Sequence, residues 1–555
     1  MNKKRILYLL ALIFLLQVSL SPGTQVKYGS APAGESLPGM KDTETKTFKE
    51  RVAAAPGKTL YLEKMQGHIT ITPGEANEIA IDGRLEVECS DPVFLNRFMS
   101  QAKLVVEPAA DGTRVRLLSS EREKGFHNTL KEFFRGRKFS FSTSARFDIK
   151  VPASQSLDID NGFGDVAITS ISGKLIVHNE SGKVRIENGG GELDLRNSFA
   201  SVTVVDFKGP VRIANESGEV EVRNIAGSAD IQNSFKSVTF DKIGGRLVVK
   251  SESGDVVGSA VAGDARIESS FKRIEVRGVE GRLEVRGESS AVTVDDVKKD
   301  VVIESSFKPV KISNVRGKLR VACESAGVSA EEIGRDAEIK SSFQAISAAR
   351  IHGALTVGGE SSAVTARDIE GNATIVSSFK DVNASNIGGY LDVKSESAKV
   401  TAADVKRYAS IVTSFQAVDL RRVGGEARIS GESSSVLAED ITGDLSVKNS
   451  FKRVEVRRTS GSIIVQGESS SVDVSQIKNL PKGGLIDIST SFNPITISLP
   501  ADADVAVSAR TQFGKINSDF PVYMRGTEPQ AKKEAGRGPT IVRLETSSNI
   551  TIRKE

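Results

Sequence analysis

The sequence predicts an all-β protein, a single elongated β-solenoid of about 18-residue coils arranged as a 36-residue double repeat. Three observations predict this fold. Residues of one type recur every 36 positions over most of the chain, each 36-residue unit divides into two similar halves, and the segments between turns alternate apolar and polar residues. A capping N-terminal region with short helices precedes the repeats, and an atypical segment follows them.

The repeat is carried by three columns in a fixed phase. The first is Phe163, Phe199, Phe235, Phe271, Phe307, Phe343, Phe379, Phe415 and Phe451. The second, in which each residue is followed by Ser, is Glu180, Glu216, Glu252, Glu288, Glu324, Glu360, Glu396, Glu432 and Glu468. A glycine column begins at Gly173 with the same interval. Three phased nine-member series do not arise by chance.

The two halves of each unit align at a spacing of 18 residues. Residues 267–276 fall on residues 285–294, so that Ser270 matches Glu288 and Phe271 matches Ser289. A strand of four or five residues cannot bury its face alone, whereas stacked coils pair with the coils above and below. From 155 to 490 roughly 335/18, or about 19, coils at ~4.8 Å each would make a rod on the order of 90 Å long. A β-propeller is the alternative, but it would need nine or more blades and explains no 18-residue period.

Strand alternation suggests where the repeated side chains point. Starting from Ile267, it places Ser269 and Phe271 inward, with a corner before Ile274. We therefore expect the Phe column to pack in the core, between coils that carry a small Ser. An exposed aromatic binding platform is the alternative.

The Glu column is expected to be structural. Glu288 should lie between Ser270 and Ser306, whose hydroxyls can donate to its carboxylate. Successive Glu residues would be two coils, roughly 9.6 Å, apart. That is too far for two of them to share one calcium ion at ~2.4 Å. A cation or ligand array along the column is the alternative.

The regions outside the repeat divide the chain into five parts. A basic start followed by an apolar run identifies residues 1–20 as a signal peptide, or as an N-terminal anchor if it is not cleaved. Residues 21–48 are expected to be a flexible linker, 49–155 an N-terminal β-rich capping region, 156–500 the solenoid and 501–555 a C-terminal cap. Within the first cap, residues 123–138 predict a basic amphipathic helix, which either covers the solenoid end or contacts a membrane surface or partner.

Composition excludes several classes of protein. Lys and Arg (75) nearly cancel Asp and Glu (71), which argues against nucleic-acid binding. Four His and two Cys leave little material for a metal site or disulfide framework. Cys323 replaces the Gly287 and Gly359 of neighbouring repeats and is interpreted as a small packing residue. The acids follow the repeat and do not gather at one irregular place, so we expect no enzyme, catalytic residue, metal or cofactor.

The chain resembles a bacterial family of adhesin-like proteins with β-strand repeats, which occur in exported and envelope proteins. The resemblance rests on residues 56–71, on residues 151–168, on the repeated Ser-Gly and Gly-Gly turns and on the closing segment 541–555, and it covers residues 50–555. The closing turn Ser548-Asn549 departs from the glycine that the family tends to have there. The family's name implies surface attachment, and no catalytic or ligand residue carries over.

These features predict a non-enzymatic, exported, adhesin-like structural or binding protein of the bacterial cell envelope. It would lie in the periplasm or on the cell surface and bind an envelope or surface partner, either protein or glycan. A polymer-forming or envelope-stress scaffold that assembles through its coil ends is one alternative. A carbohydrate-processing β-helix enzyme is the other, and the lack of a non-repeated acidic or His cluster disfavours it.

Overall fold

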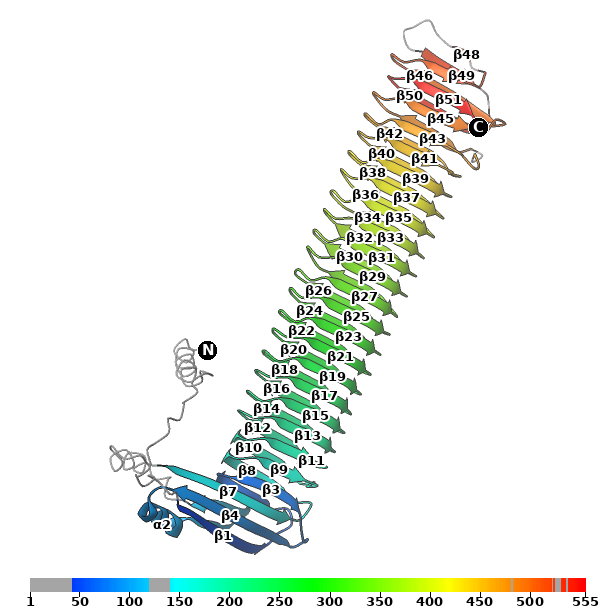
Figure 1. The fold of residues 1–555 in the computed structure, drawn as a ribbon. Helices are drawn as coiled ribbons and strands as arrows, with labels where there is room; N and C mark the ends of the chain where they lie inside the picture. Colours follow the sequence, from blue (N-terminus) through cyan, green and yellow to red (C-terminus); the bar gives the residue numbers. More distant parts are fainter. Residues whose placement is uncertain (1–41, 119–139, 481–482, 522, 525–530, 536–537) are drawn as a thin grey trace, which may run out of the picture.

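The protein forms one straight rod, seen along its full length in Figure 1. The computed structural model describes residues 42–118, 140–480, 483–521, 523–524, 531–535 and 538–555. About 60% of the residues are in strands and 2% in helix, and the solenoid has about 18 turns of about 18 residues. The predicted fold class is therefore confirmed, and the propeller alternative is wrong.

Each coil contributes one strand to each of two long parallel sheets. Sheet B of the solenoid contains β8 (Ser156–Phe163), β10 (Leu175–Ser181), β12 (Leu193–Asn197), β14 (Val211–Asn215), β16 (Ala229–Asn233), β18 (Leu247–Ser251), β20 (Ala265–Ser269), β22 (Leu283–Gly287), β24 (Val301–Ser305), β26 (Leu319–Cys323), β28 (Ala337–Lys340), β30 (Leu355–Gly359), β32 (Ala373–Ser377), β34 (Leu391–Lys394), β36 (Ala409–Val412), β38 (Ala427–Gly431), β40 (Leu445–Asn449), β42 (Ile463–Gly467) and β44 (Leu485–Ser489).

Sheet A is built by the second strand of each coil. Its solenoid strands are β9 (Val166–Thr169), β11 (Val184–Glu187), β13 (Val202–Phe207), β15 (Val220–Ile225), β17 (Val238–Ile243), β19 (Val256–Val261), β21 (Ile274–Val279), β23 (Val292–Val297), β25 (Val310–Val315), β27 (Val328–Ile333), β29 (Ile346–Ile351), β31 (Val364–Ile369), β33 (Val382–Ile387), β35 (Val400–Val405), β37 (Val418–Val423), β39 (Val436–Ile441), β41 (Val454–Arg457), β43 (Val472–Ser475) and β45 (Ile495–Leu499).

The register between coils is constant, which turns the sequence repeat into straight columns of side chains. In sheet B, Ile267 pairs with Val285 and Ser269 with Gly287; in sheet A, Ile274 pairs with Val292. Along each strand, buried apolar residues alternate with outward polar ones. The core is therefore a continuous column of Val, Ile, Leu and Ala between the two sheets, because each coil buries its inner face against the next.

A column of buried polar residues ends the sheet B strands. Asn179 donates from Nδ2 to Oδ1 of Asn197 at 3.0 Å, and Asn197 donates to Asn215 at 3.2 Å. Asn197 also donates to the carbonyl of Ala200 at 2.7 Å, which fixes the bend that follows the strand. Buried amides must find such partners, so the column sets both the register and the shape of this corner.

The opposite corner, where the sheet A strands end, holds a residue with positive φ in each of the eighteen coils from β9 to β43. We call this the αL corner: Ser170, Asn188, Asp206, Asn224, Lys242, Ala260, Gly278, Asp296, Asn314, Glu332, Arg350, Asp368, Asn386, Asp404, Arg422, Asp440, Arg458 and Gln476. Half of these are Asn or Asp, the side chains that best tolerate this conformation. The glycine column of Gly173 has no positive φ. Its glycines permit close approach instead: a Cβ on Gly281 would lie 2.4 Å from the carbonyl oxygen of Gly263.

The N-terminal strands cover the first coil, formed by β2 (Thr59–Met65) and β3 (His68–Pro73). The chain between this coil and the next one contains β4 (Glu78–Cys89), α2 (Pro92–Gln101), β5 (Lys103–Ala109), β6 (Gly112–Leu118) and β7 (Phe141–Val151). β6 pairs with β2, β7 pairs with β3, and β4 joins β7 to the edge strand β1 (Asp42–Ala53). β6 and β7 therefore continue the two sheets parallel to the first coil, and antiparallel strands follow, β5 beside β6 and then β4 and β1 beyond β7.

At the C-terminal end the coils do not stack in sequence order. The last coil contains β50 (Thr540–Thr546) and β51 (Ile550–Lys554), and the coil before it contains β46 (Val505–Thr511) and β47 (Ile516–Ser518). β50 pairs with both β44 and β46, and β51 with both β45 and β47. The last coil is thus inserted between two earlier ones, and β49 (Ala531–Ala535) and β48 (Tyr523–Met524) extend sheet B beyond β46.

Candidate functional site

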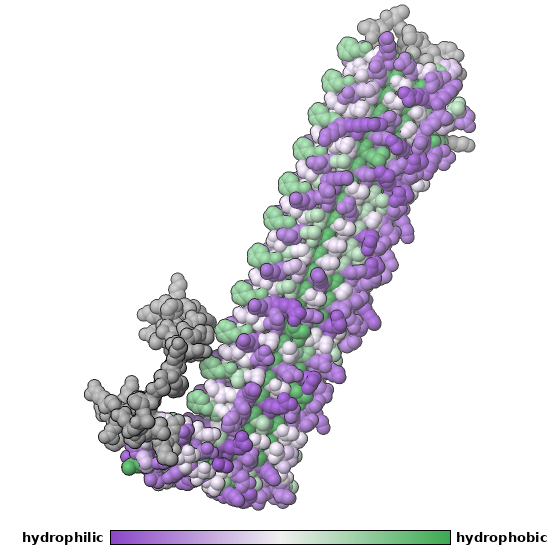
Figure 2. Space-filling model, in the orientation of Figure 1, coloured by the Kyte–Doolittle hydropathy of each residue, from purple (hydrophilic) through white to green (hydrophobic). Residues whose placement is uncertain are grey.

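The Phe column lies on the outside of the rod, so the prediction that it fills the core is wrong. The exposed residues are Phe163, Phe199, Phe235, Phe271, Phe307, Phe343, Phe379, Phe415 and Phe451, between 50% and 65% accessible. Figure 2 shows a regular row of apolar knobs along one edge of the rod. The exposed aromatic platform, the alternative considered from the sequence, matches this arrangement.

The error arises because strand alternation was extended past the end of the strand. β20 ends at Ser269, which points inward as expected, and β21 begins at Ile274. Residues 270–273 form the predicted corner, where the rule that i and i+2 share a face does not hold. The inner side of this corner is filled by small residues; in the next coil, for example, Ser290 is fully buried.

Two further phenylalanines continue the row although they break the 36-residue spacing. Phe492 and Phe513 are 71% and 82% exposed. The backbone amide of Phe492 donates to the carbonyl of Glu468 in the neighbouring coil. The backbone amide of Phe513 donates to the carbonyl of Ser547 in the inserted last coil. The inserted coil carries Ser548 at the equivalent position. Phe and Ser therefore alternate to the end of the rod, and we call the resulting row of eleven residues the Phe ridge.

The Glu column runs beside the Phe ridge, one coil out of step with it. As expected, Glu288 lies between Ser270 and Ser306 in the stack, because Ser306 donates its amide to the Glu288 carbonyl and Ser289 to the Ser270 carbonyl. All nine side chains of the column are exposed. None has an ion pair or side-chain hydrogen bond with another described residue, so the expected Ser hydroxyl bonds are not formed.

Lysines follow five of the phenylalanines and border the other side of the ridge. They are Lys236, Lys272, Lys308, Lys380 and Lys452, all exposed. Lys452 reaches back along the ridge, with Nζ 3.5 Å from the carbonyl oxygen of Phe415. The ridge is therefore flanked by carboxylates on the sheet B side and by ammonium groups on the sheet A side.

An open groove follows the Glu column over the first half of the rod. It has a volume of about 1300 Å³ and extends from Asp160 to Glu324. Its other wall consists of outward side chains near the ends of the sheet B strands, among them His178, Arg196 and Arg286. The groove and the Phe ridge form one continuous polar and apolar surface on the same edge of the rod.

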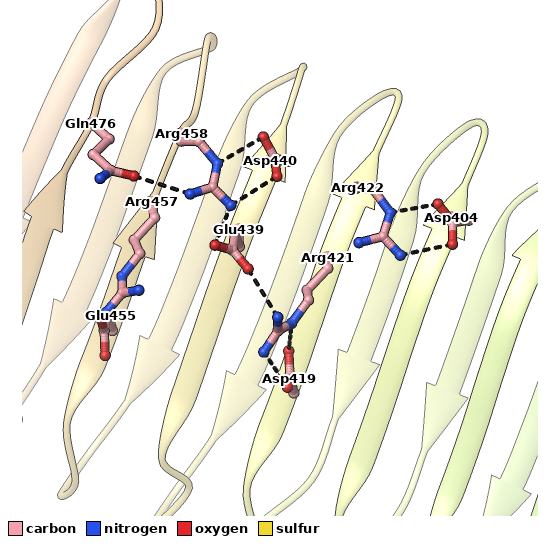
Figure 3. Close-up of polar contacts among 10 residues, drawn as sticks. All are labelled: Asp404, Asp419, Arg421, Arg422, Glu439, Asp440, Glu455, Arg457, Arg458 and Gln476. Carbon is pink, nitrogen blue, oxygen red and sulfur yellow. Dashed lines mark hydrogen bonds and ion pairs between the residues drawn. The ribbon is translucent and has the colours of Figure 1, made fainter.

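Part of the αL corner is a contrasting surface, because the charges of residues 404–458 are paired within the chain (Figure 3). Arg422 holds Asp404 of the preceding coil through two bonds of 2.6 and 2.9 Å. Arg458 bonds Asp440 in the same way, with both bonds at 3.1 Å. Acid and base alternate from coil to coil here, so stacking brings opposite charges together.

These ion pairs change the acidity of the αL corner. Hydrogen bonds from Arg458 and from Lys478, the latter at 2.7 Å, lower the pKa of Asp440 to about 2. The hydrogen bond from Arg422 lowers the pKa of Asp404. A network that satisfies itself in this way is structural, whereas the carboxylates beside the Phe ridge have no such side-chain partner among the described residues.

Replacing Phe271 with serine should leave the free energy of unfolding within about 0.5 kcal/mol of the wild type, as for other surface changes. Ile267 of the same coil is fully buried, and its replacement by alanine should cost about 2–5 kcal/mol. Urea unfolding of the full chain measures both. A loss of several kcal/mol in the Phe271→Ser variant would return the Phe column to a packing role.

Replacing Asp440 with asparagine should remove a stabilisation that depends on pH. The folded pKa is depressed to about 2, below the ordinary value of about 3.9, so the ion pairs stabilise the fold above pH ~4 and lose this effect as the pH falls towards 2. The difference between wild type and variant should be at most about 1 kcal/mol at pH 6 and should disappear as the pH falls through about 2. Thermal unfolding across this range tests it, with Asp194→Asn in sheet B as the control.

The remaining predictions concern the two cysteines, a metal site and two segments in the N-terminal part of the chain. Burial raises the pKa of the Cys323 thiol to about 11, in keeping with a packing role, and also raises that of Cys89. Within the described ranges, no three His, Cys, Asp or Glu side chains are grouped to hold a metal ion. The signal or anchor predicted at 1–20 and the basic helix predicted at 123–138 lie outside the described residues.

Comparisons of the chain with family models, with curated proteins and with solved structures found no match. None of the helices in the described parts of the chain has the length and apolar character needed to cross a membrane. The candidate site therefore rests on the geometry of the Phe ridge, the Glu column and the groove.

Proposed function

We propose that this protein is a non-enzymatic, exported, adhesin-like rod that serves as a structural or binding component of the bacterial cell envelope. The observation that supports the proposal is the Phe ridge. Eleven large apolar side chains project from the rod although the core is filled without them. Extended apolar surfaces of this kind mark interaction sites in soluble proteins.

The regular spacing of the ridge favours a multivalent contact. Successive rings are two coils apart, about 9.6 Å at the usual strand separation. Each ring alone offers a weak contact, but a rigid rod presents all of them at once, so the second and later contacts form at high effective concentration. Such a surface suits a long or repetitive partner in the envelope, either protein or glycan.

The two alternatives have less support. Antiparallel strands flank the parallel coils at one end, with β5 in sheet B and β4 and β1 in sheet A, and at the other end β49 and β48 do so in sheet B. Covered ends do not favour a scaffold that grows end to end. A sugar-processing enzyme needs a local pair of carboxylates about 5–9.5 Å apart in a built cleft, whereas the Glu column repeats along the rod without one special place.

Binding of the full chain to isolated envelope material and to a glycan array tests the proposal. A variant with Phe271, Phe307 and Phe343 changed to serine should lose at least tenfold in affinity for whatever the wild type binds. The matched control changes Arg223, Arg277 and Arg367 of sheet A to serine and should bind normally. Failure of the wild type to bind any of these materials would count against an adhesive role.

A further inference from the structure

We propose that the Phe ridge pairs with the ridge of a second copy of this chain, the two rods lying side by side, pointing the same way and displaced by one coil. The inference rests on the proposed function, since it names the partner of that same surface. It follows from the spacing of the rings, the order of the charges around them, the area available and the straightness of the rod.

The spacing of the ridge leaves room for a second ridge. Phe271 and Phe307 are two coils apart, with Ser289 between them on the intervening coil. A partner displaced by one coil can place a ring over each such serine. Rings from the two rods would then follow one another at about 4.8 Å, within the range of favourable aromatic contacts.

The charges beside the ridge select the parallel arrangement. Around the rod the columns follow one another in the order Glu column, Phe ridge, lysines. Rotation about an axis along the rods brings the Glu column of one copy opposite the lysines of the other. An antiparallel arrangement instead places Glu beside Glu and Lys beside Lys, which is unfavourable for exposed charges held close together.

The one-coil displacement also brings these charges to the same height. Glu252 lies one coil before Phe271 and Lys272, and Glu288 lies one coil after them. In two rods at equal height each lysine would therefore fall between two carboxylates of the partner. After displacement by one coil it lies directly opposite one, while the rings interleave. A single shift thus satisfies both the apolar and the charged parts of the surface.

The ridge is large enough for a stable pair. At 50–82% exposure, each Phe offers about 100–150 Å² of accessible surface, so eleven of them offer on the order of 1300 Å² per copy. If each rod buries half of this area, the interface totals about 1300 Å². This is near the lower limit of the area buried in specific protein–protein interfaces, and the flanking charges would add to it. The rod is straight, so the contact can continue along its length (Figure 1).

A lipid surface fits the same ridge less well. Nine carboxylates and only five lysines make up the two columns beside it, an excess of four carboxylates. Anionic lipids would be repelled by this edge. A second copy brings its own five lysines to the carboxylates.

Sedimentation of the full chain tests the pairing. The wild type should show a concentration-dependent dimer, and the variant with Phe271, Phe307 and Phe343 changed to serine should weaken the dimer at least tenfold while its circular dichroism and melting temperature stay unchanged. The control variant with Arg223, Arg277 and Arg367 changed to serine should dimerise like the wild type.

Two charge-reversal variants test the order of the columns. One changes Lys236, Lys272 and Lys308 to Glu, and the other changes Glu252, Glu288 and Glu324 to Lys. Each alone should dimerise at least tenfold more weakly than the wild type, whereas an equimolar mixture should recover a heterodimer. If the mixture stays as weak as its components, the proposed charge pairing is wrong.

Spin-label distances test the direction of the rods. In a background with Cys89 and Cys323 replaced by alanine, a single cysteine is placed at Lys174, near the start of the solenoid, or at Lys448, near its end. Parallel rods place the two copies of the same label at nearly the same height, one coil apart along the pair, at both positions. Antiparallel rods place both label pairs many coils apart, a result that would overturn the parallel arrangement.

The sedimentation and binding experiments separate the two proposals. A wild type that stays monomeric at every concentration overturns the pairing. If the ridge variant still loses its binding to envelope material in that case, the adhesive role stands with another partner. A monomer that also shows no ridge-dependent binding overturns both proposals.

Discussion

Replacing Asn197 with alanine should lower the free energy of unfolding of the N-terminal half of the rod by about 2–4 kcal/mol. Asn197 accepts one hydrogen bond from Asn179 and donates to Asn215 and to the carbonyl of Ala200. All three partners lie at a buried or half-buried corner. Alanine would therefore leave several polar groups without partners in a site that excludes water.

Two control variants separate the amide from the rest of the side chain. Serine occupies the same column further along the rod, where the Ser251 hydroxyl bonds the Gly254 carbonyl at 3.2 Å. Asn197→Ser should therefore lose less stability than Asn197→Ala, and Arg196→Ala on the exposed neighbour should change it by less than about 0.5 kcal/mol. Hydrogen exchange of the full chain measures the local effect. Equal stability of the alanine variant and the wild type would show that the column is dispensable.

Removing residues 540–555 should release the C-terminal end of the rod. Among the strands that the structure describes, β46 and β47 have parallel neighbours only in the inserted last coil, and β44 and β45 would lose their outer partner. The amides of residues 505–518 should then exchange as in an unfolded chain, and the exposed edges of β44 and β45 should promote aggregation. Hydrogen exchange and light scattering test both expectations.

A point variant tests the same coil without truncation. Leu544 is fully buried in β50, so Leu544→Ala should destabilise the C-terminal coils by about 2–5 kcal/mol. Arg543 of the same strand points outward, and Arg543→Ala should have little effect. If Leu544→Ala leaves the exchange of residues 505–518 unchanged, the inserted coil is not what holds this end together.

Much of the rod could be predicted because its interactions are local in the repeat. Residues 18 apart become neighbours in a parallel sheet, so Ile267 and Val285 pair as their alignment indicates. The same logic placed Glu288 between Ser270 and Ser306. It did not reveal the αL corner, because that position has no constant residue: half of its members are Asn or Asp and the others are of several types. The recurrence of Asn and Asp at Asn188, Asp206 and Asn224 was the available signal.

The Phe ridge shows where pattern alone misleads. A large apolar residue with a strict period is usually part of a core, and alternation from Ile267 pointed the same way. The direction of a side chain in a bend, however, depends on backbone angles that the spacing does not encode. An ordered stack of Val, Ile and Leu already filled the interior, so the rings had no space inside.

By itself, the sequence determined the period, the register and the two-sheet solenoid, because each coil repeats the hydrogen-bonding and apolar pattern of the one before. Only the tertiary structure decided that Phe271 and its equivalents face outward and that the last coil is inserted before its predecessor. The insertion keeps Phe492 and Phe513 in line with the ridge, although their separation in sequence is unlike that of the other rings. Both outcomes depend on contacts between segments that no local pattern connects.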